Sequence, residues 1–85
     1  MKVLIFDTDE TATEFDKLSE QLMREKIPVQ KYRLDTKDGT PVAETYDVTR
    51  SPATLVVDGA GTIINQWYDK VPAAGDVKYF VRGMM

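Results

Sequence analysis

Residues 46–59 carry the clearest pointer to the fold of this chain, and they read Tyr46-Asp47-Val48-Thr49-Arg50-Ser51-Pro52-Ala53-Thr54-Leu55-Val56-Val57-Asp58-Gly59. The run Ala53–Val57 is short, continuous and rich in strand formers, which is typical of a strand buried on both faces. Pro52 stands directly before this run. Asp58-Gly59 follows it with turn chemistry, because glycine adopts positive φ at little cost. The stretch therefore predicts a loop, a buried strand and a tight turn in succession.

The chain is expected to double back after this turn. Thr62–Tyr68 is a second strand-forming run, so the turn at residues 58–61 predicts an antiparallel hairpin. Trp67 and Tyr68 are neighbours in the returning strand and must point to opposite faces of the sheet. One of the two rings is expected in the core. For the other, partial burial under the last helix is favoured over a role in binding.

The first part of the chain alternates strand, helix and strand. Val3–Phe6 is a continuous apolar run that suits a buried strand. From Thr11 to Lys26 the apolar residues recur at helical spacing, on a stripe made of Ala12, Phe15, Leu18 and Leu22. Pro28 ends this helix, and Val29–Leu34 has the composition of the next strand. A strand, a helix and a strand in this order predict a right-handed crossover between parallel strands.

The start of the first helix carries a capping signal. Thr11 and Glu14 have the spacing of a capping box, in which each side chain accepts a hydrogen bond from a backbone N–H of the other residue. Asp9 is an alternative capping residue, so the boundary is uncertain by one turn.

Two further helices are expected. Thr40-Pro41 is typical of a helix start, with the threonine as cap, and that short helix must end near Asp47. Asp76 is expected to cap a last helix that runs through Arg82 and stops at Gly83, followed by a frayed Met84-Met85 tail. The chain thus predicts one α/β domain over residues 1–85, with the element order β-α-β-α-β-β-α.

This order, with Pro52 opening the third strand and a hairpin after it, resembles the thioredoxin and glutaredoxin family. Residues 46–59 look like that family's segment in which a helix end leads to a cis-proline, an apolar strand and a glycine turn. The resemblance covers nearly the whole chain. It implies a thioredoxin-like fold with a mixed four-stranded sheet, and it implies that the Ser51–Pro52 bond is cis.

The resemblance fails at the residues that do the family's chemistry. The family's Cys-x-x-Cys pair falls at or near Thr11 and Glu14 in this sequence, and the chain contains no cysteine. The family uses the helix N-terminus there to lower the pKa of a thiol. Without a thiol, thiol–disulfide oxidoreductase activity is excluded, and Thr11 and Glu14 are interpreted as a structural cap.

One family property does not depend on sulfur. The resemblance implies that the loop before the cis-proline pairs with an extended peptide, here through Arg50, Ser51 and Pro52, with Ser51 offering its N–H and C=O. That this proline merely shapes the loop is an equally weighted reading. The first functional hypothesis is therefore a non-redox module that binds a peptide, a protein or a second copy of itself as a homodimer.

Composition excludes several other partners. The net charge of −3 and the pI of about 4.8 argue against a nucleic-acid surface and against an anionic membrane surface. Histidine is absent as well as cysteine, and we expect no metal and no cofactor. No apolar run approaches a transmembrane span, and Asp7 comes too early for a signal peptide, so a cytoplasmic location is the default.

A second hypothesis rests on the acids after the first strand. Residues 4–11 resemble the first motif of haloacid-dehalogenase-type phosphatases, which implies Asp7 as nucleophile, Asp9 as acid–base and Mg²⁺ as the metal. Ser51 and Asp58 lack the spacing for that family's other roles, and a solvated loop is the favoured interpretation. A response-regulator receiver is rejected because too few residues follow Asp58. A structural or assembly domain is the third hypothesis.

Overall fold

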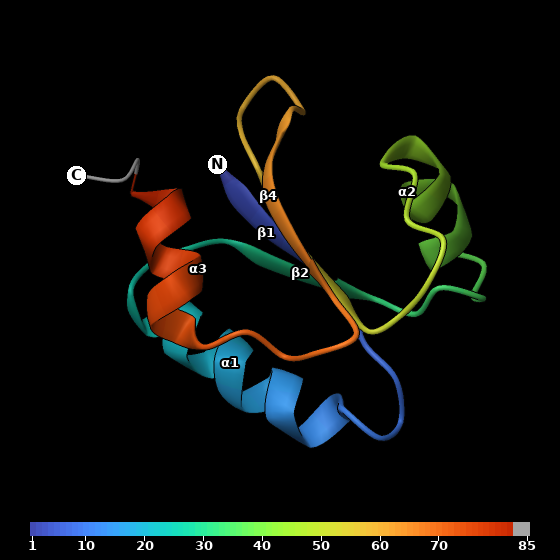
Figure 1. The fold of residues 1–85 in the computed structure, drawn as a ribbon, viewed down its shortest axis with the longest axis horizontal. Helices are drawn as coiled ribbons and strands as arrows, with labels where there is room; N and C mark the ends of the chain where they lie inside the picture. Colours follow the sequence, from blue (N-terminus) through green and yellow to red (C-terminus); the bar gives the residue numbers. More distant parts are fainter. Residues whose placement is uncertain (83–85) are drawn as a thin grey trace.

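The computed structural model describes residues 1–82, and it shows a mixed four-stranded sheet with three helices (Figure 1). The elements are β1 (Lys2–Phe6), α1 (Ala12–Arg24), β2 (Val29–Tyr32), α2 (Gly39–Thr45), β3 (Ala53–Val57), β4 (Ile63–Tyr68) and α3 (Ala74–Val81). This is the expected element order. The helix stop expected at Gly83 and the tail at Met84-Met85 lie outside the described residues.

The strands follow the order β2-β1-β3-β4. β1 and β2 are parallel, with Val3 opposite Val29, which confirms the parallel pairing predicted from the first part of the chain. β3 runs antiparallel to β1 and to β4, so the hairpin is confirmed as well. Because β3 runs opposite to β1 and β2, the first residues of β3 lie beside the last residues of β1 and β2, at the same end of the strands.

The sheet buries both of its faces. Successive residues of β1 and β3 point to opposite faces of the sheet and belong to two separate core clusters, one on each face. Both faces of these central strands are therefore apolar, which explains their continuous apolar sequences. α1 and α3 cover one face and α2 lies on the other (Figure 1). The first cluster contains Val3, Ile5, Phe15, Leu18, Leu22, Ile27, Val56 and Val77. The second contains Leu4, Phe6, Ala43, Val48, Ala53, Leu55 and Val57.

The two aromatic residues of β4 divide between these faces as expected. Trp67 packs against the first cluster and meets the ring of Phe80 edge-on, at 5.7 Å between centroids, so it is the ring under the last helix. Tyr68 packs against the second cluster and is half-buried.

The beginning of α2 differs from the expectation. Thr40 was expected to cap this helix, but the helix already starts at Gly39 and its cap residue is Asp38. Thr40 is already inside the first turn, because its N–H donates to the Thr36 carbonyl over 2.9 Å. Its hydroxyl donates to the same carbonyl over 2.8 Å rather than capping the helix. Pro41 therefore stands within the first turn, where a missing N–H costs no intrahelical bond.

The beginning of α3 also differs. Its cap is Ala73, because the N–H groups of Asp76 and Val77 both donate to the Ala73 carbonyl, over 3.1 and 3.2 Å. Asp76 thus lies in the first turn, where a carboxylate still interacts favourably with the helix dipole. Within residues 1–82, no helix has the length and apolar character that a bilayer crossing requires.

Candidate functional site

A shallow depression of about 330 Å³ lies where three loops meet, at the end of the sheet where β1 and β2 finish and β3 begins. Its walls come from Asp7–Asp9 after β1, from Arg33–Asp35 after β2, and from Ser51 before β3. The topology brings these segments together, because two parallel strands end here and the reversed strand begins here. No local sequence pattern indicated that residues 33–35 belong to this site.

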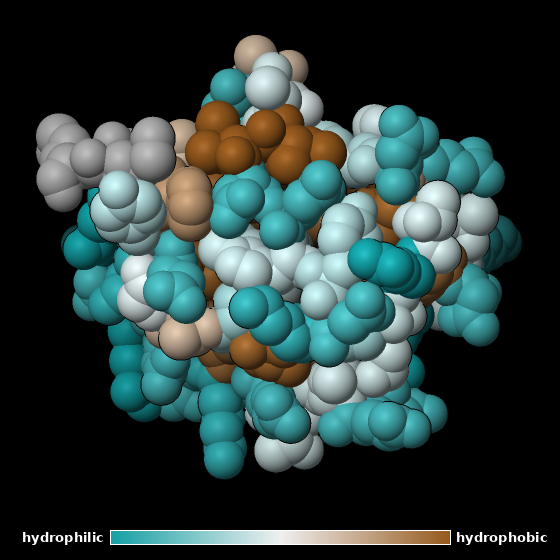
Figure 2. Space-filling model, in the orientation of Figure 1, coloured by the Kyte–Doolittle hydropathy of each residue, from teal (hydrophilic) through white to brown (hydrophobic). Residues whose placement is uncertain are grey.

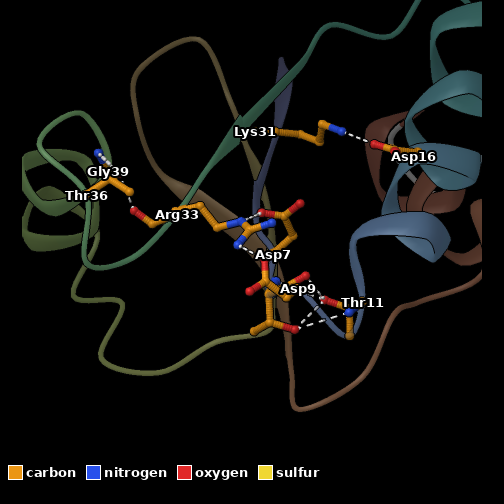
Figure 3. A network of polar contacts seen from close by, with 9 residues as sticks. Asp7, Asp9, Thr11, Asp16, Lys31, Arg33, Thr36 and Gly39 are labelled. Carbon is orange, nitrogen blue, oxygen red and sulfur yellow. Dashed lines mark hydrogen bonds and ion pairs between the residues drawn. The ribbon is translucent and has the colours of Figure 1, made fainter.

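Arg33 is the central side chain of the depression (Figure 3). Its Nε donates to Oδ1 of Asp7 over 2.7 Å, and its Nη1 donates to Oδ1 of Asp9 over 2.7 Å. These hydrogen bonds, to Asp9 first and then to Asp7, raise the pKa of Arg33 above its ordinary value. Asp7 is the buried partner and Asp9 the exposed one, since their side chains are 10% and 96% accessible. The guanidinium therefore compensates a carboxylate that has little contact with water.

The acids proposed for phosphatase-like chemistry are thus held by an internal cation. Ser51 does lie at the same depression as Asp7 and Asp9, but Asp58 does not. Asp58 is in the β3–β4 turn, where its Oδ1 accepts N–H groups from Ala60 and Thr62, each over 2.9 Å. Among residues 1–82, no three acidic side chains gather in an arrangement that could hold a metal ion.

The capping box predicted for Thr11 and Glu14 is wrong. Thr11 is the cap residue of α1, but its side chain makes no capping hydrogen bond. Its backbone is helical, with φ of −103° and ψ of −1°, and its hydroxyl turns back to Thr8. The Thr11 Oγ1 accepts the Thr8 N–H over 3.0 Å, and the two hydroxyls are 2.8 Å apart. A reciprocal Thr8–Thr11 pair therefore closes the loop into α1, and Thr-x-x-Thr was the overlooked signal.

The loop at residues 50–52 is fastened to the end of β4. The Ser51–Pro52 peptide bond is cis, as the family resemblance implies. The guanidinium of Arg50 lies 4.9 Å from the centre of the Tyr68 ring, and its Nη2 is 3.5 Å from Oδ2 of Asp69. The Asp69 N–H donates to the Pro52 carbonyl over 2.9 Å. Tyr68 and Asp69 are thus supporting residues that the sequence pattern did not reveal.

Ser51 differs from its neighbours in this loop. It lines the depression, whereas Arg50 is engaged with β4. Within residues 1–82, neither the backbone N–H nor the C=O of Ser51 has a hydrogen-bond partner. The loop therefore presents one residue with both backbone groups available at the edge of a hollow.

The sheet order, the three helices and the proline loop define a thioredoxin-like fold, here without the cysteine pair. The chain is similar to thioredoxin 1 from the thermophilic eubacterium Thermosipho africanus TCF52B, with a TM-score of 0.73 over 96% of this chain and 92% of that one. The two sequences are 13% identical, so the likeness concerns the fold. No family model and no curated protein matches the chain.

Proposed function

We propose that this chain is a non-redox binding module that holds an extended peptide segment of a partner protein against residues 50–52. The observation that carries the proposal is the unused hydrogen-bonding capacity of Ser51, whose N–H and C=O have no partner within residues 1–82. An extended peptide offers the complementary groups, because strand addition recruits unpaired backbone N–H and C=O groups.

The support of the loop favours this function. Arg50 and the Pro52 carbonyl are both tied to Asp69, so the backbone on either side of Ser51 is held before any peptide arrives. A preorganised loop loses less conformational entropy on binding than a free one. The neighbouring hollow of about 330 Å³ has room for a side chain of the peptide.

The absence of cysteine favours binding over redox chemistry. The chain has no cysteine, so it contains no thiol that could attack a disulfide. What the fold can still supply at residues 50–52 is a binding surface whose backbone N–H and C=O groups can form hydrogen bonds with a peptide. A cytoplasmic location stays a prediction.

A peptide library displayed on phage and selected against the native chain provides the probe. With a selected peptide, we expect amide NMR shifts at residues 50–53. Ser51→Ala keeps both backbone groups and should leave affinity unchanged. Ser51→Pro removes the N–H and should weaken binding about tenfold, the equivalent of one hydrogen bond. Amide spectra of both variants establish that they fold.

Two outcomes would count against this function. The first is a selected peptide whose shifts map away from residues 50–53. The second is loss of binding in Ser51→Ala, which would assign recognition to the hydroxyl instead of the backbone.

The alternative functions have their own test. A Mg²⁺ titration followed by amide NMR reports on Asp7 and Asp9, and shifts confined to residues 7–11 would favour the phosphatase-like enzyme. A structural or assembly role would be favoured if neither Mg²⁺ nor any selected peptide produced shifts.

A further inference from the structure

The depression beside Ser51 is lined by more acidic groups than basic ones. Its walls carry the carboxylates of Asp7, Asp9 and Asp35, and within residues 1–82 Arg33 is the only cation among its lining residues. A hollow whose walls are predominantly of one sign concentrates charges of the opposite sign. The depression next to the free backbone groups of Ser51 therefore favours a positively charged group.

Arg33 does not balance these acids by itself. It donates to Oδ1 of Asp7 and to Oδ1 of Asp9, each over 2.7 Å, and these bonds leave the second oxygen of both carboxylates as an acceptor (Figure 3). Asp35 is exposed, and the ion pairs among residues 1–82 leave it without a cation. Carboxylate oxygens on two walls of the depression can therefore accept hydrogen bonds from a ligand.

The cation that precedes Ser51 in the chain does not change this balance. Arg50 lies over the ring of Tyr68, 4.9 Å from its centre, and its Nη2 is 3.5 Å from Oδ2 of Asp69. Arg50 is not among the residues that line the depression. Its charge is engaged at the end of β4, so it leaves the acids around the depression unneutralised.

The depression also has an apolar wall. Leu34 is one of its lining residues and packs against the second core cluster. Around the loop that follows β1, at the lower right of Figure 2, the surface is hydrophilic to neutral. Lysine and arginine combine an apolar stem with a charged head. Such a side chain can lay its stem against Leu34 while its head donates charge-assisted hydrogen bonds to the carboxylates.

We propose that the peptide bound at residues 50–52 carries a lysine or arginine whose side chain enters this depression. This inference rests on the proposed function and adds the chemical class of the partner. An acidic residue at the same position would meet three carboxylates, so the walls also discriminate against acidic peptides. The net charge of −3 attracts a cationic peptide over a longer distance.

Peptides selected from the phage-displayed library provide the first test. We expect them to share a lysine or arginine at one position. Replacing that residue by norleucine keeps the stem and removes the charge, and it should weaken binding about tenfold, the equivalent of one charge-assisted hydrogen bond. Raising the NaCl concentration from about 50 mM to about 500 mM should reduce the difference between the two peptides, because salt screens exposed ion pairs.

The chain offers a matched pair of variants for the second test. Asp35→Asn removes one carboxylate charge from the depression and should weaken the basic peptide about fivefold, while the norleucine peptide should bind as before. Asp76→Asn makes the same change in the first turn of α3, outside the depression, and should leave both affinities unchanged. Isothermal titration calorimetry measures the four affinities.

Failure of this inference can be told from failure of the proposed function. A selected peptide that shifts residues 50–53 but has no basic residue, or that binds equally well with norleucine, overturns the basic specificity alone. An effect of Asp35→Asn no larger than that of Asp76→Asn overturns it as well. A selected peptide whose shifts map away from residues 50–53 overturns both proposals.

Discussion

The Nε atom of Arg33 donates a hydrogen bond to Oδ1 of Asp7 over 2.7 Å, joining the loop after β2 to the end of β1. The carboxylate is 10% exposed and the guanidinium side chain 38% exposed. A charge shielded from water needs a compensating partner, and here that partner comes from the neighbouring parallel strand. The contact holds two of the three segments around the depression in one arrangement.

This relationship predicts unequal effects at the two acids. Asp7→Asn should lower the free energy of unfolding by about 1–3 kcal/mol, because it removes a charged acceptor from a site with little water. Asp9→Asn should change it by less than about 0.5 kcal/mol, since that side chain is 96% exposed. Urea denaturation of both variants measures the difference. Equal effects would mean that burial at Asp7 does not govern the network.

The same network predicts little pH dependence from the arginine. A pKa raised above its ordinary value favours the protonated form in the fold, so the stabilisation is complete below that ordinary value. It is lost only when the pH rises through the still higher folded value. Arg33→Met should therefore lower the melting temperature by the same amount at pH 7 and at pH 9, as thermal unfolding at the two pH values will show. A decrease that vanishes by pH 9 would contradict this assignment.

Replacing two of the glycines by alanine should change the stability of the fold in opposite directions. A Cβ on Gly39 would lie 1.8 Å from the Arg33 carbonyl oxygen, so backbone must move to admit it. Gly39→Ala should destabilise by about 2–4 kcal/mol. Gly75 lies in α3 with nothing within 4 Å of its Cβ position, so Gly75→Ala should stabilise by about 0.5–1 kcal/mol. Chemical denaturation distinguishes the two, and a neutral Gly39→Ala would show that this close approach is not required.

Replacing Thr54 by valine should stabilise the fold. Its side chain is fully buried in β3, and within residues 1–82 its hydroxyl has no hydrogen-bond partner. Thr54→Val replaces that hydroxyl by a methyl group of similar size and should stabilise by about 1 kcal/mol. Thr54→Ser keeps the polar atom and removes the methyl, so it should destabilise. A less stable Thr54→Val would indicate that the hydroxyl has found a partner in solution.

The Thr8–Thr11 pair predicts which helix-start residue matters. Thr11→Ala removes the hydroxyl that bonds to Thr8 and should cost about 0.5–1.5 kcal/mol, the usual contribution of a hydrogen bond. Glu14→Ala should change stability by less than about 0.5 kcal/mol, because the Glu14 side chain is exposed and Thr11 has no side-chain capping bond for it to complete. Thermal melts of the two variants test this. A larger loss in Glu14→Ala would restore the capping box.

Much of the architecture was accessible from local patterns. The apolar runs Val3–Phe6 and Ala53–Val57 predicted the two central strands, because a strand covered on both faces has no polar side to interrupt it. The helix boundaries were less accurate at Thr40 and Asp76. Several residues near each start can serve as cap, and the packing of the finished helix selects among them.

Two properties of this protein follow from its amino acids alone. The order of strands and helices is set by the periodicity of apolar residues, a local signal, and thiol chemistry is excluded by composition. The site and the open edge follow instead from the way the chain folds back on itself. Arg33 meets Asp7 across 26 positions, and the outer side of β4 has no partner strand within residues 1–82 because the hairpin places β4 outermost. Such contacts depend on which elements become neighbours in space, and no short stretch of sequence encodes that neighbourhood.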